Sequence, residues 1–318
     1  MHRVLVIGGG SIGERHARCF LNTGRAQVAV CDTRPQVTQR LASEYALSAT
    51  FDDFEAIDLS GFDVAVVCVP AHLHIPYARR AVDAGVHAFI EKPLSVSLDG
   101  VAELAQAAED KGLTLGVAYV RRAFGILQRT KDVIDSGRLG QILNVFYEVG
   151  YDHRVARPDY RNTYEASRAM GGGAVQDIMS HMVNLIQWLV GPAARVTSCY
   201  DHLQIEGIDG EDTASVLLRF RDSGALANLH CCMWQAGRTE NLTLSGPDGT
   251  VTVDALAGRL GVFIRATNEW TWTDGLVEEP DSKGQTDAPF LAEANNFLDA
   301  VEGKAEAVSY THLRAHET

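Results

Sequence analysis

The sequence is missing the marks of several protein classes. None of its six cysteines forms a Cys-x-x-Cys pair, so we expect buried free thiols rather than a disulfide framework or a metal site. No apolar run approaches the roughly 18 residues that a membrane span needs. No basic region, apolar core and cleavage site precede the first strand. These absences predict a cytoplasmic protein with no membrane partner and no bound metal.

Basic residues are also few. Lys and Arg number 28 against 41 Asp and Glu, which gives a formal net charge of −13. Such a surface repels phosphate backbones, so nucleic acid is not an expected partner. A dinucleotide is not excluded, because its site needs only local positive potential and backbone N–H groups.

The 318 residues exceed the usual size of one domain, and their pattern changes once along the chain. Over residues 1–118, short runs rich in Val and Ile alternate with amphipathic stretches. This alternation predicts an α/β domain with a doubly wound parallel sheet. The expected strands are 4–7, 27–31, 64–69, 88–90 and 113–117, and the expected helices are 13–21, 74–84 and 98–110.

Over residues 119–308, strand-like runs follow one another and predict an α+β domain with a large, mostly antiparallel open sheet. We expect strands at 142–149, 197–205, 214–220, 226–234, 241–245, 250–253 and 260–264, and helices at 126–136, 174–189 and 288–301. Residues 309–318 hold one aliphatic side chain larger than Ala, so they cannot bury a helical stripe. We expect this segment to be a non-native tail.

A glycine turn gives the clearest binding signal. Gly8, Gly10 and Gly13 fit the pattern G-x-G-x-x-G between an apolar strand and a helix, and Asp32 ends the next strand. Gly8 permits the tight turn, Gly10 lets the backbone approach a pyrophosphate, and Gly13 allows close helix–strand packing. The helix N-terminus adds free N–H groups. The residues predicted to contact the phosphates are Gly8, Gly10, Ser11, Ile12 and Gly13.

Asp32 bears on the choice of cofactor. Its carboxylate can accept hydrogen bonds from the ribose hydroxyls of NAD and would repel a 2′-phosphate, so NAD is favoured. Arg34, two residues on, would offset part of that repulsion. NADP therefore stays open as the alternative.

Glu91, Lys92 and Pro93 follow a predicted strand of the first domain. In open parallel sheets, ligands bind at the carboxyl ends of strands, so Lys92 would meet a substrate beside the nicotinamide. Pro93 constrains the backbone of Lys92 and is compatible with a cis peptide. Taken alone, the segment is equally well explained by a surface lysine in a loop.

A second polar segment begins with the glycines at 171–173, which would let a helix start pack tightly against its surroundings. Asp177 and His181 follow, four residues apart on one helical face. A histidine beside a carboxylate suits general acid–base catalysis. An isolated pair of this kind is more often a solvated surface pair, so the functional interpretation depends on the other motifs.

Together these motifs resemble the glucose–fructose oxidoreductase / inositol dehydrogenase family (Gfo/Idh/MocA). The resemblance runs from about residue 2 to 308 and covers segments 8–13, 69–74, 91–93, 121–122 and 172–189. It implies a Rossmann domain followed by a domain built on a large open sheet, assembled as a homodimer or homotetramer. It also implies NAD(P)-dependent hydride transfer at a CH–OH carbon of a sugar, polyol or related hydroxy compound.

The resemblance implies that His181 is the acid/base on the reacting hydroxyl, that Lys92 polarises or protonates the same oxygen, and that Asp177 orients substrate and His181. This is physically sensible, because hydride leaves readily only as the hydroxyl proton leaves. We further expect cofactor contacts from Asp32, Arg34, Val69, Pro70, His74, Glu91 and Lys92. The expected substrate contacts are Lys92, Arg122, Tyr160, Arg161, Asp177 and His181.

The loop 152–168 leaves two interpretations open. Its arginines, Arg154, Arg157, Arg161 and Arg168, would either pair with an anionic group on the substrate or form structural ion pairs, and the structural use is the commoner one. Two other functions also stay open. One is transient oxidation within glycoside elimination or epimerisation, and the other is a non-catalytic NAD-binding sensor.

Overall fold

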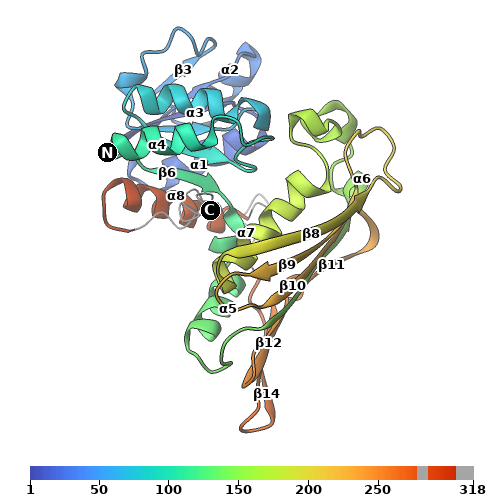
Figure 1. The fold of residues 1–318 in the computed structure, drawn as a ribbon. Coiled ribbons are helices and arrows are strands. Elements are labelled where there is room, and N and C mark those ends of the chain that lie inside the picture. The colour runs from blue at the N-terminus through green and yellow to red at the C-terminus, as the bar shows by residue number, and fades with distance from the viewer. Residues whose placement is uncertain (278–285, 306–318) are drawn as a thin grey trace. The chain divides into compact units, whose positions relative to one another are not determined.

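The computed structural model describes residues 1–277 and 286–305, which form two compact units. The first unit contains Met1–Val120 together with the C-terminal helix α8 (Ala288–Val301), and the second begins at Arg121. Figure 1 shows the ribbon with its elements. The tail at 309–318, which we expected to be non-native, lies outside the described residues.

The first unit is built on a six-stranded, fully parallel sheet in the order β3-β2-β1-β4-β5-β6. This confirms the predicted doubly wound sheet. The pattern did not reveal β3 or α2, which are short or largely exposed. The strands are β1 (His2–Ile7), β2 (Ala26–Cys31), β3 (Ala49–Phe51), β4 (Val64–Val67), β5 (His87–Glu91) and β6 (Leu115–Ala118). The helices are α1 (Ser11–Asn22), α2 (Pro35–Glu44), α3 (His74–Asp83) and α4 (Val101–Asp110).

Both faces of this sheet are covered, which is why its strands read as continuous apolar runs. Alternate strand residues form one core with α3 and α4 and a second core with α1 and α8. The prediction that residues 288–301 belong to the second domain is wrong, because the helix they form lies in the first unit. Phe297 and Leu298 are buried against the first sheet, and Arg18 of α1 pairs with Asp287 at 2.5 Å.

The second unit is built on an eight-stranded sheet in the order β14-β13-β12-β11-β7-β10-β9-β8. Only the β7–β10 pair is parallel among these pairings, so the predicted mostly antiparallel sheet is confirmed. Its strands are β7 (Asn144–Asp152), β8 (Ala193–Asp201), β9 (Thr213–Phe220), β10 (Leu226–Cys232), β11 (Trp234–Ser245), β12 (Gly249–Asp254), β13 (Arg259–Ile264) and β14 (Glu269–Thr273). Its helices are α5 (Gly125–Asp135), α6 (His153–Ala156) and α7 (Ser180–Val190), with a π-helical turn at Val175–Met179.

Short 3-10 turns complete both units. They are η1 (Leu59–Gly61), η2 (Ala71–Leu73), η3 (Val120–Ala123), η4 (Tyr160–Asn162), η5 (Tyr164–Ala166) and η6 (Arg168–Met170). Three of them, η4 to η6, lie in the segment between β7 and the π-helical turn, where the sequence predicted a loop.

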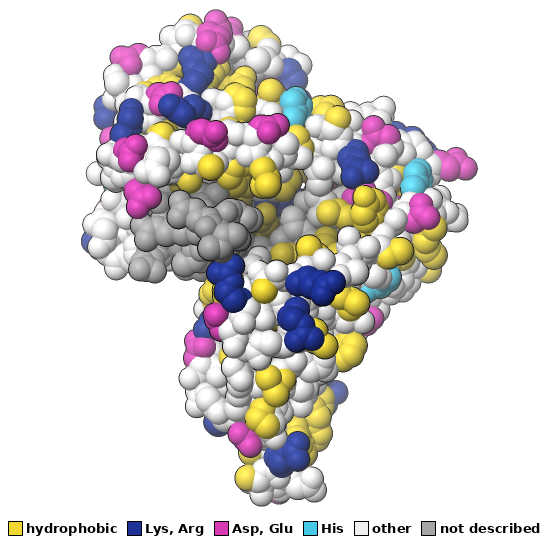
Figure 2. Space-filling view, in the orientation of Figure 1, with side chains coloured by type: hydrophobic (Ala, Val, Ile, Leu, Met, Phe, Trp, Pro, Cys, Tyr) yellow, Lys and Arg dark blue, Asp and Glu magenta, His cyan; other side chains and the backbone are white. Residues whose placement is uncertain are grey.

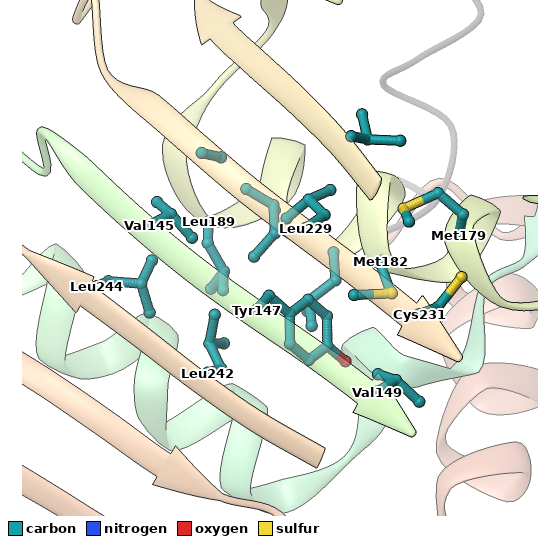
Figure 3. Packing of buried hydrophobic residues seen from close by; sticks show 14 of the residues in the cluster. Val145, Tyr147, Val149, Met179, Met182, Leu189, Leu229, Cys231, Leu242 and Leu244 are labelled. Carbon is teal, nitrogen blue, oxygen red and sulfur yellow. The ribbon is translucent and has the colours of Figure 1, made fainter. Parts of the chain in front are cut away.

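One face of the eight-stranded sheet packs against α7. Figure 3 shows Tyr147 of β7 and Leu229 of β10 pointing toward Met182 and Leu189 of α7. Full burial of each such side chain stabilises the fold by about 1.5–3 kcal/mol. The helix that carries His181 is therefore fixed to the sheet by its apolar face.

The predicted strand at 197–205 ends four residues early, at Asp201. The reason lies in the buried carboxylate of Asp212, which accepts the backbone N–H groups of Leu203 (3.0 Å), Gln204 (2.7 Å) and Ile205 (2.8 Å). These bonds fold the chain into a loop where strand pairing would otherwise continue. The edge strand β14, which is exposed along its whole length, was not predicted.

Within the described residues, no helix is both long and apolar enough to cross a membrane. All six cysteines lie in described segments, and each is a free thiol. Acidic, basic and apolar side chains are interspersed on the visible face of the molecule (Figure 2).

Candidate functional site

The glycine turn of the first unit shows which glycines the protein itself requires. Gly8 has φ +99°, and a Cβ there would lie 2.6 Å from the carbonyl oxygen of Cys68. A Cβ on Gly13 would lie 1.8 Å from the carbonyl oxygen of Gly8. A Cβ on Gly10, in contrast, would meet no atom within 4 Å. Internal packing therefore explains Gly8 and Gly13, whereas the open approach to Gly10 fits a ligand lying against the backbone.

Helix α1 begins at this turn with its N-terminus available for an anion. Its first intrahelical bond runs from Glu14 N to Gly10 O at 2.8 Å, so the N–H groups of Ser11, Ile12 and Gly13 precede that ladder. These groups and the positive end of the helix dipole suit a pyrophosphate. The residues of the turn thus fit a dinucleotide.

Asp32 lies at the end of β2 with both carboxylate oxygens engaged. Oδ2 accepts Gly9 N at 2.8 Å, and the Arg34 guanidinium forms a two-point pair with the carboxylate, at 2.8 Å in each contact. Burial acts to raise the pKa of Asp32, but the bonds from Arg34 and Gly9 outweigh it and lower the pKa. The carboxylate is therefore an ionised acceptor, and a ribose would share it with Arg34.

The segment after β5 is held in place by the buried pair of Glu91 and His16. Glu91 Oε1 lies 2.6 Å from His16 Nε2, and Glu91 Oε2 accepts the backbone N–H of Lys92 at 2.9 Å. Burial acts to raise the pKa of Glu91, but the bond to His16 reverses the effect and lowers it. The Lys92–Pro93 peptide is cis, as the sequence allowed. Glu91 thus positions the backbone of Lys92.

His16 was missed at the sequence level. It lies on α1 with no exposed surface, and its ring meets Phe89 edge-on at 5.5 Å between centroids. The sequence offered one signal: a histidine stands among the positions of this amphipathic helix that face the core. A buried polar group needs a hydrogen-bonding partner, so a partner could have been expected.

His74 is also buried, and both of its ring nitrogens face backbone carbonyls. Nδ1 lies 2.8 Å from Pro93 O, and Nε2 lies 2.7 Å from Val69 O. The ring joins the turn after β4 to the turn after β5. Its direct contact with a cofactor stays a prediction, as do the contacts of Val69 and Pro70.

In the second unit, the glycines at 171–173 pack as the sequence predicted. A Cβ on Gly172 would lie 2.3 Å from Glu165 O, and one on Gly173, where φ is +97°, would lie 2.9 Å from Glu211 Oε1. Glu211 also caps the helix start, because its backbone oxygen accepts Ala174 N at 2.7 Å and its Oε1 accepts Val175 N at 2.9 Å. This buried acid, which sequence reasoning missed, fixes the start of the segment that carries Asp177.

The helix we predicted over 174–189 starts as a π-helical turn. Asp177 lies in this turn, Val175–Met179, and His181 lies at the second position of α7. Ser180 Oγ donates to the carbonyl oxygen of Gln176 at 2.7 Å, which helps satisfy the widened turn. Turns of this type are frequent at functional sites, so the irregularity supports a role for the segment.

A polar cluster lies beside Asp177. His153 is buried, with Nδ1 3.3 Å from the hydroxyl of Tyr151 and Nε2 3.3 Å from Oε2 of Glu165. Burial is the main cause that raises the pKa of Tyr151, and the charges of Asp177 and Glu165 add to it. Tyr151 therefore stays a neutral hydroxyl next to the predicted catalytic carboxylate. Neither Tyr151 nor His153 was predicted.

Three predicted substrate contacts have structural partners in the second unit. Arg122 is buried, and its Nε donates to Asn184 Oδ1 of α7 at 2.7 Å. Tyr160 is buried and donates to Glu206 O at 2.7 Å, while the guanidinium of Arg161 lies 4.9 Å from the centre of the Tyr160 ring. Their contacts with substrate stay predictions.

The other arginines of the loop 152–168 also have partners. Arg154 pairs with Asp152 at 2.7 Å, and Arg157 lies 3.7 Å from Glu165. The guanidinium of Arg168 lies 5.8 Å from the centre of the Tyr200 ring. These contacts favour the structural interpretation of the loop.

The structure thus gathers the predicted cofactor residues around the carboxyl ends of β1, β2, β4 and β5, and it gathers Asp177 and His181 at the start of α7. Among residues 1–277 and 286–305, no group of three or more His, Cys, Asp or Glu side chains could hold a metal ion.

A fully parallel sheet with a glycine turn at the start of α1 and an acid at the end of β2 defines a dinucleotide-binding Rossmann protein. The chain belongs to the oxidoreductase family with an NAD-binding Rossmann fold, whose model matches residues 2–119. The model of the GFO/IDH/MocA C-terminal domain matches residues 127–252.

Relatives and solved structures agree with this assignment. The chain is 28% identical over 207 residues to D-glucoside 3-dehydrogenase of Escherichia coli K12, covering 64% of this chain and 58% of that protein, which is less than two thirds of its length. It is 26% identical to inositol 2-dehydrogenase of Rhizobium meliloti, covering 95% of this chain and 89% of that one. Levoglucosan dehydrogenase in complex with NADH shares the fold, with a TM-score of 0.86, 20% identity, and 98% and 93% coverage.

Proposed function

We propose that the protein is an NAD-dependent dehydrogenase that oxidises a CH–OH carbon of a sugar, polyol or related hydroxy compound. The observation that carries the proposal is the placement of Asp177 in a π-helical turn, whose start is fixed by Glu211, and of His181 at the beginning of α7, which follows it. Simple surface helices need no such buried acid, glycine packing and irregular turn. The names of the relatives, which act on glucosides and inositol, support the substrate class.

When bound, NAD supplies a hydride acceptor. His181 takes the proton of the reacting hydroxyl as its carbon is oxidised, because a neutral imidazole has one nitrogen that accepts a proton. The Lys92 ammonium stabilises the negative charge that develops on the same oxygen. Asp177 orients His181 and the substrate hydroxyls.

A panel of polyols, free sugars and glycosides, followed at the absorbance band of reduced nicotinamide, tests this proposal. We expect stoichiometric NADH formation with at least one polyol or sugar. Conversion of a glycoside without net NADH would favour transient oxidation within an elimination or epimerisation. Tight NAD binding with no conversion of any compound would favour a sensor.

We also propose that the chain forms a homodimer or homotetramer through the outer face of its eight-stranded sheet. Phe146, Leu217 and Leu226 are each about half exposed there, on the three neighbouring strands β7, β9 and β10. Sedimentation velocity of the wild type and of Phe146→Lys tests this, and a monomeric wild type would contradict it. The six free thiols support a cytoplasmic location.

A further inference from the structure

His74 lies where the turn that follows β4 and the turn that follows β5 come together in the first unit. It is the first residue of α3 and is 1% exposed. Its Nδ1 contacts the carbonyl oxygen of Pro93 at 2.8 Å, and its Nε2 contacts that of Val69 at 2.7 Å. These carbonyls follow β5 and β4, which are neighbours in the sheet. One ring thus spans both turns that we expect to contact the cofactor.

The two partners set a condition on the protonation of the ring. A carbonyl oxygen only accepts, and a neutral imidazole carries a single N–H, so a neutral ring can bond to one of the two carbonyls. Only the imidazolium donates to both. In the neutral ring, the second nitrogen directs its lone pair at a carbonyl oxygen.

Opposing influences act on this ring. Burial lowers the pKa of His74, whereas the carbonyls of Pro93 and Val69 and the charge of Glu91 act to raise it. Glu91 is in turn held by His16 on α1 and by the amide of Lys92. Burial is the largest of these influences and lowers the pKa of His74, so the state with both contacts made is favoured only as the pH falls.

We propose that His74 is a positioning residue whose protonation locks the Val69–Pro70 turn to the Lys92–Pro93 turn and thereby strengthens NAD binding. The proposal rests on the cofactor contacts expected of these turns. Loss of one hydrogen bond on deprotonation would weaken NAD binding about 3- to 10-fold.

The test is titration of NAD into the purified full chain at several pH values from 8.0 down to 4.5, without substrate, by calorimetry. The variants are His74→Phe, which keeps a ring and loses both bonds, and His72→Gln, which removes an exposed histidine of the same segment. We expect wild type and His72→Gln to bind NAD 3- to 10-fold more tightly at the acid end of this range. We expect His74→Phe to bind weakly at every pH. Wild-type affinity and pH dependence in His74→Phe would overturn the proposal.

A second measurement serves if His74→Phe does not fold. Nitrogen NMR of the histidine side chains in wild-type protein, with His74 assigned through a His74→Gln variant or by its bonds to two carbonyls, reports the protonation of each ring nitrogen. We expect both nitrogens of His74 to carry protons at the acid end of a titration from pH 8.0 to pH 4.5, because the pKa of the ring is lowered. A ring that stays neutral over the whole range would overturn the proposal. Since no substrate is present, failure of the dehydrogenase proposal would leave these results unchanged, and the converse also holds.

Discussion

The glycine turn of the first unit and the predicted catalytic segment of the second (residues 171–181) use different means to hold their shape. The shape of the turn depends on close packing of the backbone: a Cβ on Gly13 would lie 1.8 Å from Gly8 O, while the space beside Gly10 is open. The shape of the predicted catalytic segment depends on side-chain contacts: Glu211 caps the helix start, and His153 lies against Glu165. A backbone site is defined by a few neighbouring residues, whereas a side-chain site is assembled from distant ones.

The largest expected effects are losses of turnover. Lys92→Ala and His181→Ala should each lower turnover about 100-fold or more, because each removes proton transfer or charge stabilisation at the reacting oxygen. Steady-state rates with the best compound of the panel measure this. NAD binding, measured in parallel, should largely survive in both. Turnover near the wild-type value in both variants would reject the catalytic assignment.

Two alanine substitutions in the glycine turn separate packing from binding. Gly13→Ala should destabilise the fold by about 1–3 kcal/mol through overpacking against Gly8. Gly10→Ala should change stability by about 1 kcal/mol or less, because its methyl group meets open space in the unliganded chain. It should nevertheless weaken NAD binding about tenfold or more by filling the path of the pyrophosphate. Urea unfolding measures the stability of both variants, and titration with NAD measures their binding. Unimpaired NAD binding by Gly10→Ala would contradict binding of the pyrophosphate at this turn.

Asp32→Ala should weaken NAD binding about 10- to 100-fold, the effect of losing hydrogen bonds to a charged group. It should also narrow the preference over NADP, because Arg34 is then released from its partner. Arg34→Ala is the matched variant and should widen the preference for NAD. The ratio of the two dissociation constants is the quantity to measure, and an unchanged ratio in both variants would contradict the role of this pair.

The smallest effect concerns Glu91 and pH. Its pKa is lowered in the folded chain, so its ionised form stabilises the fold above the unfolded pKa of about 4.3. That contribution is lost as pH falls through the folded value. Glu91→Gln should therefore lower stability at pH 7 by about 1–3 kcal/mol, and the deficit should shrink toward pH 3. Glu44→Gln, in an exposed pair with Arg40, is the control. A deficit that does not change with pH would contradict this account.

The same contrast explains what the sequence could reveal. The glycine turn, Asp32 and the glycines before the catalytic helix could be identified because their constraints are local. His16 and Glu211 could not, because their partners lie 75 and 36 residues away along the chain. The strand predicted to reach residue 205 failed for the same reason, since Asp212 takes the backbone donors. The spacing of apolar residues predicted helix α8, but this spacing does not indicate which of the two sheets the helix packs against.

Titration of NAD and NADP into the wild-type protein tests the central claim most directly. The account predicts one NAD site per chain and weaker binding of NADP, because the ionised Asp32 carboxylate would repel a ribose 2′-phosphate. Absence of NAD binding, or tighter binding of NADP, would contradict it.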